Sequence, residues 1–439
     1  MPNLRYTVRL VSAFLTRFKI LIGLGILFGI IFFFVLKFLL PAFSGATTQK
    51  IGITGRYTPS TIPNSILLMI GDGLTKLSPD GSVEPGLATS WETPDKGKTW
   101  IFRLKDGLFW QDGKKVVSSD VLYQFSDVVS ENPDDKTIVF KLQNPYSAFP
   151  SVVSKPAFKK GLLGTGSWLV KKLSLAGSYV DQISLQNKNG EKIIYKFYPT
   201  EERTKLAFQL GEVDEIKDVL GPSPFDTWKK AKIAEDVDTG EYVAVFFNNQ
   251  DKILADKNIR QALSYAIDKD SLGQMRAISP ISIDSWAYNP QVKPYSFDLE
   301  KAKGTISKLP SDVKDGLVIN LTTAPVLLPT AEKIAKNWEA LGIKVNLQVG
   351  SGIPTDYQAF LAIFDIPEDP DQYSIWHSTQ TASNITHYQN PRIDKLLEDG
   401  RSQLDIEERR RTYLDFQRFL VEDSPAAFLY YPTTYTITR

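Results

Sequence analysis

Two segments of the chain combine aromatic side chains with carboxylates or prolines, a pattern typical of loops that line a ligand site. Residues 285–288 read Ser-Trp-Ala-Tyr and lie between Pro280 and Pro290. The second segment begins at Asp365, continues through further acidic residues and prolines, and reaches the aromatic residues of 373–376. Aromatic rings beside carboxylates suit a ligand that carries an amine and variable side chains. For each single aromatic residue, packing in a core is an equally open interpretation.

The sequence offers few residues and motifs for catalysis. The sequence has no cysteine, which excludes disulfides, zinc–thiolate sites, iron–sulfur clusters and cysteine nucleophiles. Its only histidines, His377 and His387, are ten residues apart, and neither has a further ligand at metal-binding spacing. Serine-hydrolase, zinc-protease and EF-hand patterns are absent. We therefore expect no enzyme activity, no cofactor and no metal, and a surface hydrolase is the least supported function.

Length and composition indicate a folded protein of more than one domain. At ~150 residues per domain, 439 residues leave room for two or three domains. Hydrophobic residues make up 42% and charged residues 23% of the chain, which is ordinary for a folded protein. The formal net charge is +1, so charge gives no indication of nucleic-acid binding.

The N-terminal region contains a long apolar run. Residues 20–36 are all apolar or glycine, and the run resumes after Lys37 as far as Phe43. This length predicts a transmembrane helix over 20–43. Basic residues precede it and no acidic residue does, so residues 1–19 are expected in the cytoplasm and the rest outside. A cleavable signal peptide is the alternative, but the run exceeds the usual 7–15-residue signal core.

Along the rest of the chain, segments with the two-residue period of a strand alternate with segments with the 3.6-residue period of a helix, which predicts an α/β protein. Trp100, Phe102 and Leu104 alternate with polar residues as in a half-buried strand. The clearest unit is 317–349, where a strand, a helix from Thr330 and a second strand follow one another. Such a unit is expected to form a right-handed parallel crossover.

Several blocks of the sequence resemble the extracellular solute-binding proteins, family 5, which are the dipeptide, oligopeptide and nickel-binding proteins of ABC importers. The first blocks read LATSWE, GKTWIFRLKDG, FWQDG and SDV at residues 87–92, 97–107, 109–113 and 119–121. Later blocks that look like those of the family lie at residues 164–166, 247–249, 259–269, 341–345 and 388–397. Together the blocks span about 85 to 431 in the expected order.

The resemblance implies a two-lobed, periplasmic-binding-protein-like α/β fold of type II with a small extra β-rich subdomain. The first lobe is expected over 50–250, with the small subdomain at about 78–162. The second lobe is expected over 251–424, and 425–439 should return to the first lobe.

The resemblance also implies a function. Such a protein captures a short peptide, or another small solute, in a cleft between its lobes and delivers it to the permease and ATPase subunits of an ABC importer. The apolar run at 20–43 would hold it at the membrane. The alternative is a sensor or interaction module of the same fold that acts through a membrane partner.

In family members that bind peptides, an aspartate of a DYxDP-like segment holds the α-amino group. Here the segment is one residue longer, so alignment from its left selects Asp365, whereas alignment from its right selects Ile366. The full set of expected cleft residues is Asp365, Trp286, Tyr242, Asn248, Asp369, Tyr373 and Trp376.

Overall fold

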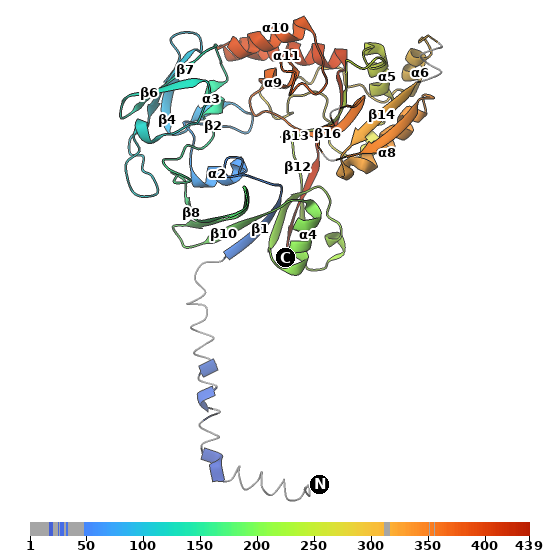
Figure 1. Ribbon diagram of the computed structural model, residues 1–439. Helices are drawn as coiled ribbons and strands as arrows, with labels where there is room; N and C mark the ends of the chain where they lie inside the picture. Colours follow the sequence, from blue (N-terminus) through green and yellow to red (C-terminus); the bar gives the residue numbers. More distant parts are fainter. Residues whose placement is uncertain are drawn as a thin grey trace, which may run out of the picture.

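The computed structural model describes residues 17–20, 25, 27–29, 32–33, 48–310, 317–350, 352–354 and 356–439 (Figure 1). The predicted anchor at 20–43 and the predicted cytoplasmic segment 1–19 lie for the most part outside the described residues. Within the described ranges, no helix has both the length and the apolar character needed to cross a membrane.

A seven-stranded mixed sheet, with strand order β12-β18-β11-β1-β10-β9-β8, forms the first part of the fold, which we call lobe I. Strand β1 lies at its centre and is parallel to both neighbours, β10 and β11. Helix α4 packs on these strands; Thr200 caps its start and Gly211 ends it in the left-handed conformation. Its strands and helices are β1 (Thr48–Thr54), α2 (Asn64–Ile70), β8 (Trp168–Ala176), β9 (Tyr179–Asn187), β10 (Lys192–Tyr198), α4 (Glu201–Leu210), β11 (Glu215–Val219), β12 (Lys232–Val237) and β18 (Thr433–Thr438).

A small subdomain, residues 75–153, is inserted between α2 and β8. It consists of the hairpin β2–β3, a four-stranded sheet of order β4-β5-β7-β6, one short α-helix and one turn of 3-10 helix. Trp100, Phe102 and Leu104 of β5 are at most 5% exposed, which confirms the predicted alternation. Its elements are β2 (Thr75–Leu77), β3 (Val83–Pro85), β4 (Ala88–Glu92), β5 (Thr99–Leu104), β6 (Val128–Asp134), β7 (Thr137–Leu142) and α3 (Phe149–Val152).

A five-stranded sheet of order β15-β14-β16-β13-β17 forms the second part of the fold, which we call lobe II. Strands β14 and β15 are parallel and joined by α8, which confirms the predicted unit, although the helix begins at Leu328 rather than Thr330. Its elements are β13 (Glu241–Phe247), α5 (Lys257–Ala266), α6 (Leu299–Ile306), β14 (Val318–Thr323), α8 (Leu328–Glu339), β15 (Lys344–Val349), β16 (Ala359–Asp365), α9 (Tyr373–Trp376), α10 (Pro391–Ser402), α11 (Ile406–Asp423) and β17 (Ala426–Tyr430).

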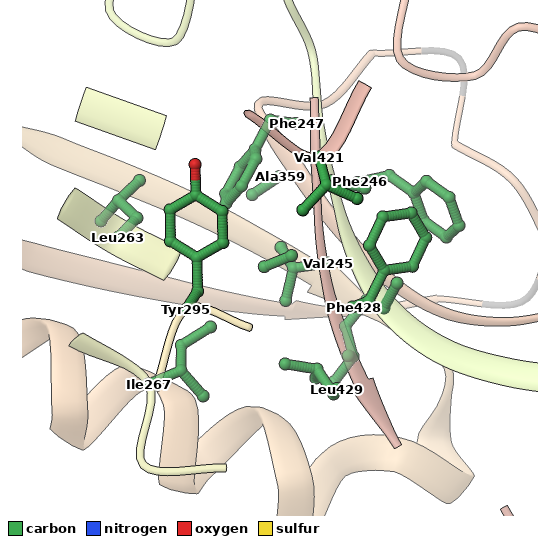
Figure 2. Packing of buried hydrophobic residues seen from close by; sticks show 14 of the residues in the cluster. Val245, Phe246, Phe247, Leu263, Ile267, Tyr295, Ala359, Val421, Phe428 and Leu429 are labelled. Carbon is green, nitrogen blue, oxygen red and sulfur yellow. The ribbon is translucent and has the colours of Figure 1, made fainter. Parts of the chain in front are cut away.

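The core of lobe II is built around β13. Strand β13 is antiparallel to β16 on one side and to β17 on the other, and Tyr242 to Phe247 are 0% exposed. Figure 2 shows Val245 and Phe246 of this strand beside Phe428 of β17. A strand that is covered on both faces in this way is a rigid base for residues at its ends.

The chain passes between the two lobes twice. The first passage joins β12 to β13 through residues 238–240, and the second joins β17 to β18 through residues 431–432. The amide of Asp238 donates to the carbonyl of Pro432 at 2.9 Å and ties the two passages together. These positions differ from the expected lobe boundaries at 250 and 425, because β13 and β17 pair with each other in the sheet of lobe II.

Candidate ligand-binding site

A cavity of about 590 Å³, here called the large cavity, lies between lobe II on one side and the small subdomain with α2 of lobe I on the other. Its walls come from α2, from the hairpin β2–β3, and from the lobe II segments 282–285 and 366–368. The amide of Trp286 donates to the carbonyl of Asp80 at 2.9 Å, so the two sides are joined at one edge.

The lining of the large cavity carries more acidic than basic groups. Lys76 is the one basic residue among its described lining residues, and it is paired with Asp72 at 3.0 Å. Asp80, Asp284 and Glu368 make no ion pair within the described chain. Hydrogen bonds from Ser82 hold the pKa of Asp80 below its usual value.

A second cavity, of about 430 Å³, lies where the chain passes between the lobes, and we call it the carboxylate cavity. Five carboxylates and no basic side chain line its described wall. Lobe I contributes two of them, lobe II two more, and the first passage between the lobes contributes one. They are Glu201, Asp218, Asp238, Glu241 and Asp365.

One of these carboxylates is already neutralised. Glu201 pairs with Lys205 at 2.8 Å and accepts a hydrogen bond from the amide of Leu220. The other four carboxylates of the carboxylate cavity make no ion pair with any described residue. The cavity therefore holds an excess of negative charge shared between the lobes.

Burial and this excess charge shift the protonation of the cavity. Burial, the charge of Asp238 and a hydrogen bond with Asp365 raise the pKa of Glu241 to about 8. Glu241 and Asp365 are direct cross-strand partners in the β13–β16 ladder. Burial also raises the pKa of Asp218; the charge of Lys217 opposes this shift, and the nearby carboxylates Asp238 and Asp236 add to it. Each shift would be relieved by a cation placed among these groups.

Two of the residues expected in the cleft lie at the cavities. Asp365, at the end of β16, lines the carboxylate cavity. Trp286 lies at the edge of the large cavity through its backbone bond to Asp80, and its ring packs against Tyr413 at 6.4 Å. Ile366, the residue selected when the acidic segment is aligned from its right, lines the large cavity instead.

Three of the expected residues lie elsewhere in lobe II. Tyr242 and Trp376 are 0% and 1% exposed, and both rings pack against Phe428 in the core. Asn248 directly follows β13, and its side-chain amide donates to the carbonyl of Tyr357 at 2.9 Å. At 3.3 Å per residue, that end of the strand is roughly 20 Å from Glu241.

Asp369 and Tyr373 bind arginines of the C-terminal helices. Asp369 forms a two-point ion pair with Arg409, in which Nη1 and Oδ2 are 2.9 Å apart. The guanidinium of Arg401 lies over the ring of Tyr373 at 4.3 Å from its centre. Both residues hold the segment after β16 against α10 and α11.

The sequence interpretation did not single out Asp218, Asp238 or Glu241. The sequence does mark this region locally, because an acidic run at residues 235–241 directly precedes an apolar strand. Its meaning depends on the pairing of β13 with β16, which joins distant parts of the chain.

Two lobes with separate sheets and cores, two connecting passages and cavities between them define an α/β protein of the periplasmic-binding-protein-like type. The chain belongs to the bacterial extracellular solute-binding proteins, family 5. The sequence pattern of this family, described as "family 5 Middle", matches residues 82–384. This confirms the resemblance found in the sequence blocks.

Similar proteins and structures agree with this assignment. The chain is 24% identical to the oligopeptide-binding protein AppA of Bacillus subtilis, over 86% of this chain and 84% of that one. The structure of NikZ from Campylobacter jejuni in complex with Ni(L-His) is similar with a TM-score of 0.73 and 23% identity, over 89% and 94% of the two chains. The structure of AppA from B. subtilis in complex with a nonapeptide gives a TM-score of 0.69 and 22% identity, over 90% and 95%.

Proposed function

We propose that this protein captures short peptides between its lobes and delivers them to the permease and ATPase subunits of an ABC importer. The observation that carries the proposal is the carboxylate cavity, where Asp218 of lobe I faces Glu241 and Asp365 of lobe II without a basic residue in the described wall. A peptide with a free N-terminus supplies the missing cation.

The ammonium group of the peptide sits among these carboxylates and donates charge-assisted hydrogen bonds to them. Because the carboxylates belong to both lobes, the ammonium also removes repulsion between the lobes and favours the closed arrangement. The rest of the peptide extends into the large cavity, whose wall includes Ile366 next to Asp365. No bond of the ligand is made or broken.

Binding of a matched peptide pair tests this proposal. We expect the full-length protein to bind trialanine, and N-acetylation of the peptide to weaken binding at least tenfold in isothermal titration calorimetry. The variant Asp365→Asn should bind trialanine more weakly and lose much of this discrimination. Equal affinity for the free and the acetylated peptide would contradict a role for the carboxylate cavity, and mass spectrometry of co-purified ligands gives an independent check.

The proposal includes attachment to the membrane through residues 20–43, with residues 1–19 in the cytoplasm. It is supported by the uncharged apolar run and the preceding basic residues. We expect the protein to stay in the membrane fraction after an alkaline carbonate wash, and external protease to degrade the part from residue 48 onward. Release by the wash would contradict an anchor.

A further inference from the structure

A third cavity, of about 270 Å³, opens beside the carboxylate cavity, and we call it the apolar pocket. All of its described lining residues are apolar or glycine. It shares the lining residues Ile363 and Phe364 with the carboxylate cavity, so the two adjoin at β16. Its other principal wall residues are Ala324, Val326, Leu327, Phe360, Ala362 and Ile385.

The wall of the apolar pocket is held in place by packing. Phe364 stacks on the ring of Tyr242 at 5.7 Å and contacts Phe246 at 5.5 Å, and both partners belong to the buried strand β13. Phe360 is 5% exposed and contacts the ring of Tyr357. The part of the wall that lies on β16 is therefore formed before a ligand arrives and imposes little ordering cost on binding.

The mouth of the pocket exposes apolar surface. Val326 lies in a short turn directly after β14 and is 51% exposed. Exposed apolar surface beside a polar cleft is typical of a binding site, because it gains free energy only when a ligand covers it.

The size and position of the pocket restrict what can occupy it. Whole small-molecule ligands use cavities of ~300–1,000 Å³, so this pocket suits part of a ligand. The shared wall at Ile363 and Phe364 places that part next to the group that binds among Glu241 and Asp365. The occupant is therefore an apolar group carried close to a cation.

We propose that the apolar pocket binds the apolar side chain of the residue that carries the ligand's free amine, and so selects peptides that begin with a residue such as leucine. This assignment rests on the proposed function and narrows its substrate class. Burying such a side chain is expected to improve affinity about 10- to 100-fold over a glycine at the same position.

A pair of matched variants tests the assignment. Val326 and Val349 are 51% and 52% exposed, but only Val326 lines the apolar pocket. The affinities of the full-length protein for Leu-Gly-Gly and Gly-Gly-Gly are measured by isothermal titration calorimetry in wild type, Val326→Asp and Val349→Asp. Thermal melting establishes that both variants are folded.

We expect the wild type and Val349→Asp to prefer Leu-Gly-Gly over Gly-Gly-Gly by at least tenfold, and Val326→Asp to lose most of this preference. Equal affinity of the wild type for both peptides would overturn the assignment and leave the capture of peptides intact. Preference unchanged in Val326→Asp would also overturn it, since the exposed surface would then serve another partner. Failure to bind either peptide would overturn the proposed function and this assignment with it.

Discussion

At the scale of single residues, the hydroxyl of Tyr242 stands out because it is buried without a hydrogen-bond partner among the described residues. Burying a hydroxyl without a partner costs free energy, since the group gives up its bonds to water. Burial also raises the pKa of Tyr242 far above its usual value, so the group stays neutral. The ring contributes packing with Phe364 and Phe428, and the oxygen contributes no hydrogen bond.

We therefore expect Tyr242→Phe to leave the free energy of unfolding unchanged or to raise it by up to ~1–3 kcal/mol, measured by urea denaturation. The control is Tyr431→Phe, because the equally buried hydroxyl of Tyr431 accepts a hydrogen bond from the amide of Ile283 at 3.0 Å. That variant should lose stability, by about 1 kcal/mol or more. A loss of the same size in both variants would contradict the absence of a partner for Tyr242.

Glu241 gives the protein a specific dependence on pH. Its pKa is raised to about 8 in the folded protein, so between pH 5 and 8 the folded state holds a proton that the unfolded chain has released. The contribution of this group to the free energy of unfolding is fully present below pH ~4.5 and is lost as the pH rises through about 8.

The glutamine of the variant Glu241→Gln cannot ionise, so this variant should not lose stability in this way as the pH rises. We expect the melting temperature of Glu241→Gln, relative to wild type, to rise from pH 5 to about pH 8 and then to level off. The control Glu235→Gln removes a carboxylate from the exposed face of β12 and should leave the pH profile of the wild type unchanged. A difference between Glu241→Gln and wild type that does not vary with pH would exclude this role for Glu241.

At the scale of elements, the position of α11 depends on the ion pair between Arg409 and Asp369. The two side chains are 6% and 11% exposed, and the hydroxyl of Ser151 in α3 donates to the same carboxylate at 3.4 Å. The charge of Asp369 raises the pKa of Arg409 despite its burial, so the arginine stays charged in the interior. One carboxylate thus joins α11, the segment after β16, and the small subdomain.

We expect Asp369→Ala to lower the free energy of unfolding by about 3–5 kcal/mol, because it leaves the buried guanidinium of Arg409 without a counter-charge. The control is Asp415→Ala on the outer side of α11. Asp415 pairs with Arg418 at 2.9 Å, but both side chains are more than half exposed. That change should cost less than ~1 kcal/mol in urea denaturation. Similar losses in the two variants would contradict a special role for the buried pair.

The elements that could be predicted from the sequence are those whose pattern is local. The alternation of Trp100, Phe102 and Leu104, and the strand–helix–strand unit at 317–349, each follow from the periodicity of a short segment. Strand β13 lacks such a pattern, because it is covered on both faces and nearly every residue in it is apolar. The side on which Tyr242 lies was therefore not readable from its neighbours in the sequence.

The candidate site was predictable only where a sequence block marks it. Asp365 was found because its acidic segment resembles a block of the family, and it lines the carboxylate cavity. Asp369 belongs to the same segment but has a different role, because it pairs with Arg409. This pairing could not be predicted, since Arg409 reaches Asp369 only in the folded protein. Glu241 was missed because its partner in the ladder lies far along the chain.

At the scale of the whole molecule, the small subdomain contacts both lobes. Toward lobe I, the side-chain amide of Gln111 donates to the carbonyls of Ile70, Gly166 and Trp168 at 2.8–3.0 Å. Toward lobe II, the amide of Ser147 donates to the carbonyl of Arg401 at 2.8 Å. Figure 1 shows α10 and α11 extending from lobe II toward β7 and α3.

The contact with lobe II is the one more suited to break. The guanidinium of Arg401 lies between the rings of Tyr146 and Tyr373, at 4.7 and 4.3 Å from their centres, and its Nε bonds to Asp371 at 3.0 Å. Beside the backbone bonds of Ser147 and Trp286, the contact with lobe II consists of these side-chain contacts across a partly exposed surface, whereas Gln111 makes three bonds to backbone carbonyls of lobe I. Arg401, which lines neither cavity, is thus one of the side chains that hold lobe II to the small subdomain.

We expect Arg401→Ala to shift the full-length protein toward a separated arrangement, because about 1 kcal/mol of cation–π attraction and a partly buried ion pair are lost. The amide of Ser147 should exchange with deuterium faster, since its bond to the backbone of residue 401 lasts only while the contact is closed. Affinity for trialanine should fall about 3- to 10-fold, in proportion to the closed fraction. The control Arg418→Ala removes an arginine with the same two kinds of contact, over the ring of Phe419 and to Asp415, on an outer surface. Equal exchange at Ser147 in both variants would show that lobe II is held to the small subdomain by other contacts, such as that of Asp369 with Ser151.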